Sequence, residues 1–566
     1  MTANSREKTL RSLLFIGPAL VTIFVIDSVV TDPVNTPKLF ILGVLSFGML
    51  GSVAHGITKD EIFQRRVPLA LLSIFLLVST ITLFTSKAPF IQSVYGVYGR
   101  NNGYLTYLFF ALMFMGCLFV TSLSTHLRIV HSLFIAGVVN AAYCGWVLLF
   151  GDFLSWSNPY GNILGTFGNP NFIGAFLGMF FVAWFAILMG PTSSKFFRYS
   201  SLLVLPLTAA EIYLSRAIQG RVLMVGGSAL VIFYWIRFKF KSRTMLASYS
   251  IFALAGALFA IAGALQIGPL TGMIYKASVS LRGQYWIAAW NTGKEHPWTG
   301  VGFDSLGDWY RRMRDAHALE LPGIDTVINT AHNVPLDLFA FGGWPLLMAY
   351  LALVSITGFE IIRFSKKQNN YDAVFVALTV AWVSFQIQSF ISINQIGLGF
   401  WGWLLSGSIL SYVRISSRSE GSSIPNSANK ARNLRSTANP IGSGLVSSLA
   451  MVVGALLAVP PLASDIKWMS AQNSRDAAKV ELSLTPGYMN PENTQKYLMA
   501  IQLFEQSNLT ELSHKYALQA LRYNPDVFDS WKLLSLLRNS TGEEKQLALD
   551  NMKRLDPLNP TLMSEG

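Results

Sequence analysis

The chain has 566 residues, of which 52% are hydrophobic and only 13% are charged. Ordinary globular domains contain roughly 25% charged residues, so a chain built only of soluble domains is excluded. The apolar residues gather in blocks of about 20 that contain almost no charge, and a helix of that length crosses the hydrocarbon core of a bilayer. We therefore expect an all-α polytopic membrane protein.

These apolar blocks predict about thirteen transmembrane helices. They are expected near 11–30, 37–56, 67–85, 104–123, 129–150, 170–190, 199–215, 220–236, 247–267, 335–361, 372–392, 396–413 and 444–463. The first block follows Arg6, Lys8 and Arg11, and in this respect it resembles a signal peptide. Its apolar stretch is too long for one and no small-x-small cleavage site follows, so we interpret it as a retained first helix.

The net charge of +13 has two interpretations, nucleic-acid binding or membrane topology, and the positions of the basic residues favour topology. They cluster in alternate loops, on the side of the N-terminus: Lys59/Arg65/Arg66, Arg128, Lys195/Arg198, Arg237/Lys239/Lys241/Arg243, Arg363/Lys366/Lys367 and Arg414 through Arg435. The positive-inside rule then places the N-terminus and these loops in the cytoplasm. The residues after 463 carry 11 Lys and Arg against 13 Asp and Glu, and we place them outside. No nucleic-acid partner is expected.

This topology divides the chain into four parts. A transmembrane domain of about twelve helices occupies 1–413 and contains an extracytoplasmic loop at 268–333, called the long loop below. Residues 414–442 are rich in Ser, Asn and Arg, and they are expected to form a disordered basic cytoplasmic linker. A thirteenth helix at 443–463 then leads to an extracytoplasmic helical tail domain at 464–566.

The tail domain contains a weak internal repeat. The pairs Asn524-Pro525 and Asp556-Pro557 each follow a helical stretch and lie thirty-two residues apart. This spacing resembles tetratricopeptide repeats, in which stacked helix pairs often bind a protein partner. An unrelated small helical bundle is the alternative interpretation.

Two arginines stand at the ends of neighbouring spans, in the segment `EIYLSRAIQGRVLM`. Arg216 and Arg221 are five residues apart across an expected turn, so their guanidinium groups can converge near the outer membrane surface. Two such groups suit the oxygens of a phosphate or pyrophosphate. The alternative is that each side chain extends to lipid headgroups.

Two further candidates lie in the long loop. Arg282 shares a helical face with Trp286 and Trp290, a pattern that also fits an amphipathic helix lying on the membrane surface. His332 precedes an expected span, where Asn333 can cap the helix. A histidine held at a helix start can act as a base, although a structural role is the alternative.

Metal chemistry is not expected from the sequence. The seven histidines are scattered, and no His-x-x-x-His or carboxylate cluster is present in the segments placed outside. Cys117 and Cys144 both fall within predicted spans and are interpreted as small packing residues. We therefore expect neither a metal nor another cofactor.

Several motifs in the middle of the chain resemble the O-antigen ligase/O-antigen polymerase family of bacterial glycan-assembly enzymes, which includes O-oligosaccharyltransferases. They are `GTFGNPNFIGAFLGM`, `SRAIQG`, `LRGQYWIAAWNTGKEHPWTGVGF` and `AHNVPLDLFAFGGWPLL`, in family order, and the resemblance covers roughly 160–360. The last two resemble the family's Arg-x-x-x-Trp and Pro-x-x-Gly-x-Gly pattern and its His-Asn start with a Gly-Gly pair. The sequence departs from the family pattern at Ala217, where glycine is expected.

The resemblance implies a twelve-helix bundle in the bacterial cytoplasmic membrane, with a long loop between its ninth and tenth helices. It implies glycosyl transfer from an undecaprenyl-pyrophosphate-linked glycan to a hydroxyl acceptor. Arg282 and His332 then take the catalytic roles, and Arg216 with Arg282 binds the pyrophosphate; the nearby Arg221 leaves the assignment of the helix arginine open.

The chemistry of the residues agrees with this implication. Arginines can stabilise a departing pyrophosphate without a metal, and a histidine can deprotonate a hydroxyl, a role that suits a pKa near neutrality. One-step displacement would invert the anomeric configuration. The acceptor is open between a glycan, a glycolipid and a protein hydroxyl, and a transporter or flippase of a lipid-linked anion is the alternative function.

Overall fold

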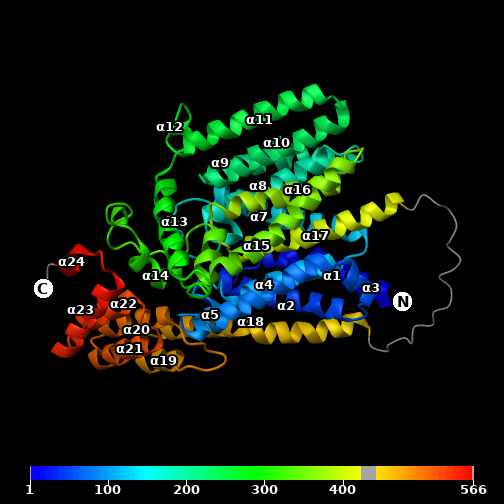
Figure 1. Ribbon diagram of the computed structural model, residues 1–566. Helices are drawn as coiled ribbons and strands as arrows, with labels where there is room; N and C mark the ends of the chain where they lie inside the picture. The colour runs from blue at the N-terminus through cyan, green and yellow to red at the C-terminus, as the bar shows by residue number, and fades with distance from the viewer. Residues whose placement is uncertain (1, 422–441, 564–566) are drawn as a thin grey trace.

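The computed structural model describes residues 2–421 and 442–563, and these contain helices and no β-strand. The all-α prediction is therefore confirmed for this part of the chain. A helix coincides with each predicted span: α1 (Thr2–Ile23), α2 (Asn35–Ala54), α4 (Arg66–Phe84), α6 (Tyr104–Leu118), α7 (Leu123–Phe150), α8 (Pro170–Leu188), α9 (Lys195–Leu214), α10 (Ile218–Phe240), α11 (Arg243–Ala264), α15 (Val334–Lys367), α16 (Ala373–Ser389), α17 (Ile396–Gly421) and α18 (Ser443–Ser474). Figure 1 shows these helices running side by side in one bundle.

Nine helices of the described residues are long and apolar enough to cross a membrane. The helices α6 and α16 are apolar but shorter, and α1 and α9 do not meet the same criterion. A multi-pass membrane protein is confirmed, whereas the count of thirteen spans stays a prediction. The helix α1 ends at Ile23, seven residues before the predicted end of the first span.

The segment predicted as a linker lies partly in a helix. The helix α17 continues to Gly421, so 414–421 belong to it, and 422–441 lie outside the described residues. At the other end, α18 extends to Ser474, well past the predicted end of the last span at 463. The buried ring of Trp468 on this extension belongs to the apolar core of the tail domain. The tail domain is thus joined to the bundle by a continuous helix.

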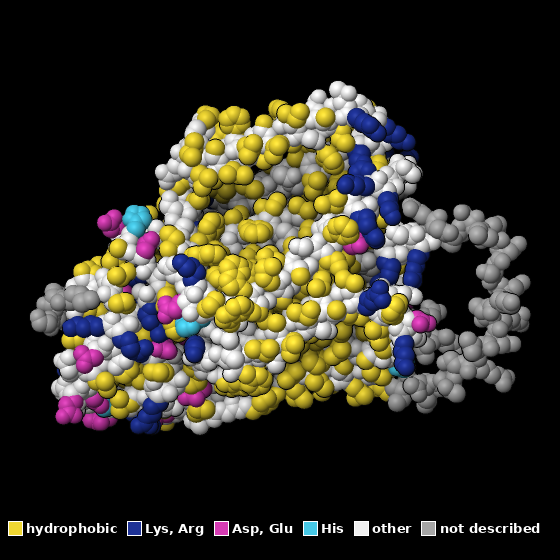
Figure 2. All heavy atoms as spheres, viewed as in Figure 1, with side chains coloured by type: hydrophobic (Ala, Val, Ile, Leu, Met, Phe, Trp, Pro, Cys, Tyr) yellow, Lys and Arg dark blue, Asp and Glu magenta, His cyan; other side chains and the backbone are white. Residues whose placement is uncertain are grey.

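The two ends of the bundle differ in charge. In Figure 2, a broad apolar band crosses the middle of the molecule, and Lys and Arg side chains gather at the end that carries the N-terminus. The opposite end, formed by the long loop and the tail domain, carries side chains of both signs. This distribution matches the alternation of basic loops in the sequence.

Small residues allow the closest helix contacts. The helix α18 packs along α2, where a Cβ at Gly454 would lie only 2.2 Å from the carbonyl oxygen of Gly43. The helix α10 packs along α8 in the same way, since a Cβ at Gly220 would lie 2.4 Å from the carbonyl oxygen of Gly174. Close backbone approach at small residues is a common way to pack membrane helices. The thirteenth predicted helix is therefore an integral part of the bundle.

Short elements connect the bundle helices and form the long loop. They are α3 (Lys59–Gln64), α5 (Phe90–Tyr95), the 3₁₀ turn η1 (Gly165–Phe167), α12 (Thr271–Ile274), α13 (Ala277–Glu295), α14 (Leu306–Met313) and the 3₁₀ turn η2 (Ala316–Leu319). In Figure 1, α13 runs across the end of the bundle, and it packs against α15 and α14. Ala289 on α13 is fully buried by these contacts, while Trp290 is 42% exposed. The helix is therefore held by protein on one face and is not a freely lying surface helix.

The tail domain consists of α19 (Ala477–Leu484), α20 (Thr494–Gln506), α21 (Thr510–Tyr523), α22 (Phe528–Leu536), α23 (Gly542–Leu555) and α24 (Pro560–Met563). The helix α20 packs against α21, and α22 packs against α23. The two pairs end at Asn524-Pro525 and Asp556-Pro557, the motifs of the internal repeat. Helix pairs at this spacing agree with the repeat pattern, and the tetratricopeptide assignment stays a prediction.

Candidate functional site

The site is built around an interruption of α15. Gly343 leaves the helical conformation with φ 64°, and a Cβ there would lie 2.2 Å from the carbonyl oxygen of Pro297. The carbonyl of Phe341, just before the interruption, accepts a hydrogen bond of 2.9 Å from the backbone N–H of Gly302. Just after it, the N–H of Trp344 donates to the carbonyl of Pro297 at 2.8 Å. The Pro-x-x-Gly-x-Gly segment and the Gly-Gly pair thus form one hydrogen-bonded unit, which satisfies the backbone that the interruption exposes.

His332 lies immediately before α15, and hydrogen bonds of the residues before and after it hold its backbone in place. Asn333 caps the helix by accepting a hydrogen bond of 3.0 Å from the N–H of Leu336, so the predicted cap is confirmed. The buried carboxylate of Asp337 accepts a hydrogen bond of 2.7 Å from the N–H of Ala331. His332 itself has φ 54°, a conformation that few residues other than glycine adopt. Such a backbone persists only where its surroundings hold it, and it often marks a functional residue.

The His332 side chain lies near a tyrosine and within electrostatic reach of two arginines. Its ring lies 5.8 Å from the ring of Tyr285 on α13, measured between centroids. Burial lowers the pKa of His332 to about 3, and the positive charges of Arg100 and Arg282 act in the same direction. The imidazole is therefore neutral at physiological pH and able to accept a proton. The sequence suggested a pKa near neutrality, and the largest cause of the difference is burial of the ring, which a sequence does not display.

Arg216 and Arg221 lie together with a lysine that was not predicted. Arg216 occupies the turn between α9 and α10 with φ 57°, and its carbonyl accepts a hydrogen bond from Nζ of Lys276. Arg221 lies with its guanidinium 4.8 Å from the ring centroid of Tyr213 and donates to that residue's carbonyl at 3.3 Å. Burial lowers the pKa of Lys276, and the charges of Arg221 and Arg216 lower it further. We call Arg216, Arg221 and Lys276 the cation cluster.

The first sequence motif supports the turn that carries Arg216. A Cβ at Gly174 in α8 would lie 2.9 Å from Cβ of Ala217 and 3.1 Å from Oγ of Ser215. That hydroxyl in turn accepts a hydrogen bond of 3.2 Å from the N–H of Ala217. The Gly-Asn-Pro-Asn motif therefore begins the helix α8, and Gly174 of this helix packs directly against the turn that carries Arg216.

The structure forms two groups from the predicted residues. Arg282 is close enough to His332 to lower its pKa, and Arg216 and Arg221 both act on Lys276 in the cation cluster. The helix α13 connects the groups, because Lys276 immediately precedes its first residue and Arg282 lies six residues further on. Six residues span about 9 Å along a helix axis, which is comparable to the length of a pyrophosphate with its flanking groups.

A cavity of about 770 Å³ opens beside His332. It is lined by the α1–α2 loop, by 98–102, by the segment leading into α8, and by Asn329, His332 and Gln395. Oδ1 of Asn102 and Oε1 of Gln395 are buried there without a hydrogen-bond partner. Arg100 also lines this His332 cavity, whereas Arg282 and the members of the cation cluster do not.

The tail domain is fastened to the long loop by a buried ion cluster. The carboxylate of Asp556 accepts hydrogen bonds from Arg314 at 2.7 and 2.8 Å and from Arg311 at 3.0 Å. Its side chain is fully buried, and those of Arg314 and Arg311 are 0% and 6% exposed. The other repeat motif docks nearby, since Asn524 donates to Asp308 at 3.0 Å. We call the contact of Asp556 with the two arginines the Asp556 anchor.

In the described parts of the chain, no three His, Cys, Asp or Glu side chains are grouped so that they could hold a metal ion. Both cysteines are buried and free, as the sequence suggested. Two residues near the site, Arg100 and Lys276, were missed by the sequence analysis. Arg100 lies in the segment `VYGVYGRNNGY`, which has no helical periodicity, although its glycines and aromatic residues could have indicated an ordered loop.

Comparison with known proteins finds a match in the part of the chain that forms the site. Residues 201–351 match the family model described as O-Antigen ligase, and they include the turn of Arg216, the long loop and the first half of α15 with its interruption. A comparison with curated proteins gives no match. The matched segment and the polytopic helices together support a multi-pass membrane protein with an O-antigen ligase domain and a glycan-transfer function of that type.

Proposed function

We propose that this protein is a glycosyltransferase of the bacterial cytoplasmic membrane that moves a glycan from undecaprenyl pyrophosphate to a hydroxyl acceptor. The observation that carries the proposal is the position of His332. It feels the positive charges of Arg282 and Arg100 and lines a large polar cavity, within a segment matched by the O-antigen ligase model. A neutral base, a source of positive charge and space for a sugar chain therefore occur together.

The reaction is a single displacement at the anomeric carbon. The acceptor oxygen forms a bond to that carbon while the bond to the pyrophosphate oxygen breaks, and the hydroxyl proton passes to the His332 ring. The pyrophosphate leaves with the electron pair, and its developing charge is stabilised by Arg282 and the cation cluster. Attack from the side opposite the leaving group inverts the anomeric configuration. The charge comes from arginine and lysine side chains, so the proposed reaction needs no metal.

Donor binding would also prepare the base. The positive charges of Arg100 and Arg282 help to lower the pKa of His332 in the free protein. A bound pyrophosphate offsets these charges, so it raises the pKa of His332 and makes the imidazole a stronger base. Proton transfer is most efficient when the pKa of the base lies near the working pH. Arg282 thus binds the donor, and the arrival of the pyrophosphate raises the proton affinity of His332.

The proposed orientation follows from the charge distribution. The end of the bundle with the N-terminus carries the Lys and Arg side chains, as Figure 2 shows, and we place it in the cytoplasm. The long loop, His332 and the tail domain then face the outer side of the membrane. Lipid-linked glycans would enter from the bilayer, with the pyrophosphate at the level of the cation cluster.

A cellular experiment tests this function. Glycans from a deletion strain would be compared by mass spectrometry with those from strains expressing wild type or His332→Ala. Loss of chain length identifies a polymerase, loss of attachment to lipid a ligase, and loss of attachment to protein an O-oligosaccharyltransferase. His332→Ala is expected to reproduce the deletion, and unchanged glycans in all strains would contradict the proposal.

A matched pair of variants tests which of the two arginines, Arg216 or Arg221, binds the donor. Arg216 is exposed, while Arg221 is partly buried and already engages Tyr213. We therefore expect Arg216→Ala to weaken donor binding more than Arg221→Ala, measured as the KM for lipid-linked donor. A larger effect of Arg221→Ala would assign the pyrophosphate to that residue instead.

A further inference from the structure

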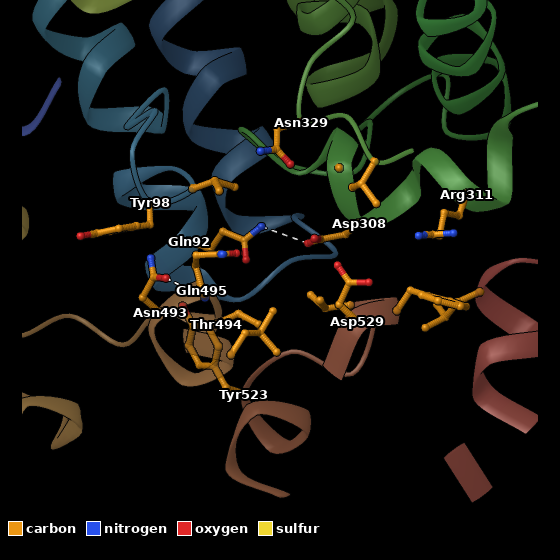
Figure 3. Close-up of a pocket in the computed structure, with 17 residues that line it drawn as sticks. Gln92, Tyr98, Asp308, Arg311, Asn329, Asn493, Thr494, Gln495, Tyr523 and Asp529 are labelled. Atoms are coloured by element: carbon orange, nitrogen blue, oxygen red, sulfur yellow. Dashed lines mark hydrogen bonds between the residues drawn. The ribbon is translucent and has the colours of Figure 1, made fainter. Parts of the chain in front are cut away.

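A second, smaller pocket lies where the tail domain meets the long loop. Figure 3 shows its labelled residues, which come from α5 and the turn after it, from the long loop and from the tail domain. Its volume is about 120 Å³. Since one water needs roughly 10–15 Å³ of such space, the pocket holds on the order of ten waters, the size of one sugar residue. We call it the interdomain pocket.

Three of the polar side chains that the tail domain presents here are without partners in the described part of the chain. Oγ1 of Thr494 is buried and makes no hydrogen bond, and the side chains of Gln495 and Asp529 also line the pocket without a polar contact among the described residues. From the long loop, the amide of Asn329 faces the same space. Hydroxyl, amide and carboxylate groups bind the hydroxyls of a neutral sugar well.

The charges of the pocket argue against a phosphate ligand. Among the described residues, Arg311 is the one that lines the pocket with a positive charge, and its guanidinium already binds Asp556 at 3.0 Å. Asp308 and Asp529 add negative charge to the lining. Rings of Tyr98, Tyr523 and Phe528 supply apolar walls. Aromatic walls with a few placed polar groups are typical of small-molecule sites.

The interdomain pocket adjoins the His332 cavity. Tyr98 and Asn329 line both spaces, which therefore lie on either side of these two residues. The hydroxyl of Tyr98 donates to Asp465, and its ring lies 5.2 Å from Nζ of Lys496, so its position is fixed from the tail side. Arg282 and the cation cluster, which would bind the pyrophosphate of the donor, line neither space, and we therefore assign both spaces to the acceptor.

We propose that the tail domain supplies a sugar subsite for the acceptor: the interdomain pocket binds one sugar of a glycan whose reactive hydroxyl lies at His332. This inference rests on the proposed function and names its acceptor as a glycan long enough to reach the tail domain. Gln495 and Asp529 bind the hydroxyls of that sugar, and the Asp556 anchor keeps the pocket formed.

Full-length protein in nanodiscs tests the subsite with a double variant, Gln495→Ala with Asp529→Ala. The matched control is Gln546→Ala with Asp550→Ala, an exposed pair on α23 whose side chains bond to each other at 3.0 Å. The probes are oligosaccharides released by mild acid from the lipid-linked glycans of the source cells and separated by length. Binding is measured by saturation-transfer NMR, and transfer is measured as KM and kcat for each length.

The double variant is expected to raise Kd and KM about 10- to 100-fold for long oligosaccharides, as two lost hydrogen bonds would. Short oligosaccharides and kcat should be unchanged, and the control should match wild type. Equal Kd values for wild type and the double variant, an equal loss for short oligosaccharides, or a rise only in the KM of the donor would each overturn the subsite. If wild type binds these oligosaccharides in the interdomain pocket without transferring them, the proposed function fails, and the pocket is a glycan-binding site but not an acceptor subsite.

Discussion

The Asp556 anchor makes a quantitative prediction about how the tail domain is held. Replacing Asp556 with alanine leaves the guanidinium groups of Arg311 and Arg314 buried without their carboxylate. Both residues are at most 5% exposed. Removing one partner of a buried ion pair typically costs about 3–5 kcal/mol. Converted at about 1.4 kcal/mol per decade, docking of the tail domain should weaken about 10²- to 10⁴-fold.

A neighbouring carboxylate provides the matched control. Asp526 also binds two arginines, Arg312 at 3.3 Å and Arg554 at 3.0 Å, but its side chain is 23% exposed and that of Arg554 is 48% exposed. Water screens these pairs, so Asp526→Ala should cost only about 0–1 kcal/mol. The comparison separates the effect of burial from the mere loss of an ion pair.

Hydrogen–deuterium exchange of full-length protein measures the docking of the tail domain. In Asp556→Ala, amides of α14 and of the α23 C-terminus should exchange faster, while amides in the middle of α8 should not change. In Asp526→Ala, all three regions should exchange as in wild type. Unchanged exchange of α14 in Asp556→Ala would show that the anchor does not hold the tail domain, and the reasoning above would be refuted.

Three further predictions concern the site and the topology. Arg282→Lys keeps the charge but loses the planar donor geometry of arginine, so transfer should fall markedly, measured as kcat/KM for the donor. Arg100→Ala removes a positive charge near His332 and so raises the pKa of this histidine, and the acidic limb of the pH profile of kcat/KM should move to higher pH. The pKa should recover only part of the way to that of a free histidine, because burial is the largest cause of its lowering. Reporter fusions after residue 243 should behave as cytoplasmic and those after 310 as extracytoplasmic; the opposite pattern would invert the proposed orientation.

The bundle could be predicted because its signal is local. Long apolar blocks specify helices, and each predicted span coincides with a helix of the structure. The capping role of Asn333 was equally local, since it depends on the first turn of α15. Span boundaries were less accurate, as the early end of α1 and the long extensions of α17 and α18 show. Hydropathy does not report where a helix continues into water or into another domain.

The surroundings of the site depend on contacts between distant segments, which a single sequence does not display. Arg100 lies near His332 only because the loop between α5 and α6 lines the same cavity. Lys276 could not be chosen in advance, since its role depends on a hydrogen bond to the carbonyl of Arg216, sixty residues away. The Asp-Pro motif likewise predicted a helix end, but the pairing of Asp556 with Arg314 appears only when the tail domain is docked.

Transfer by purified protein tests the central claim most directly. Wild type and His332→Ala would be reconstituted with lipid-linked glycan and acceptor in EDTA, and released undecaprenyl pyrophosphate and transferred glycan would be measured by mass spectrometry. We predict that wild type releases both products in equal amounts in EDTA, and that His332→Ala is slower by a factor of about 10²–10⁴. A strict requirement for Mg²⁺ or Mn²⁺, or wild-type turnover by His332→Ala, would contradict the account.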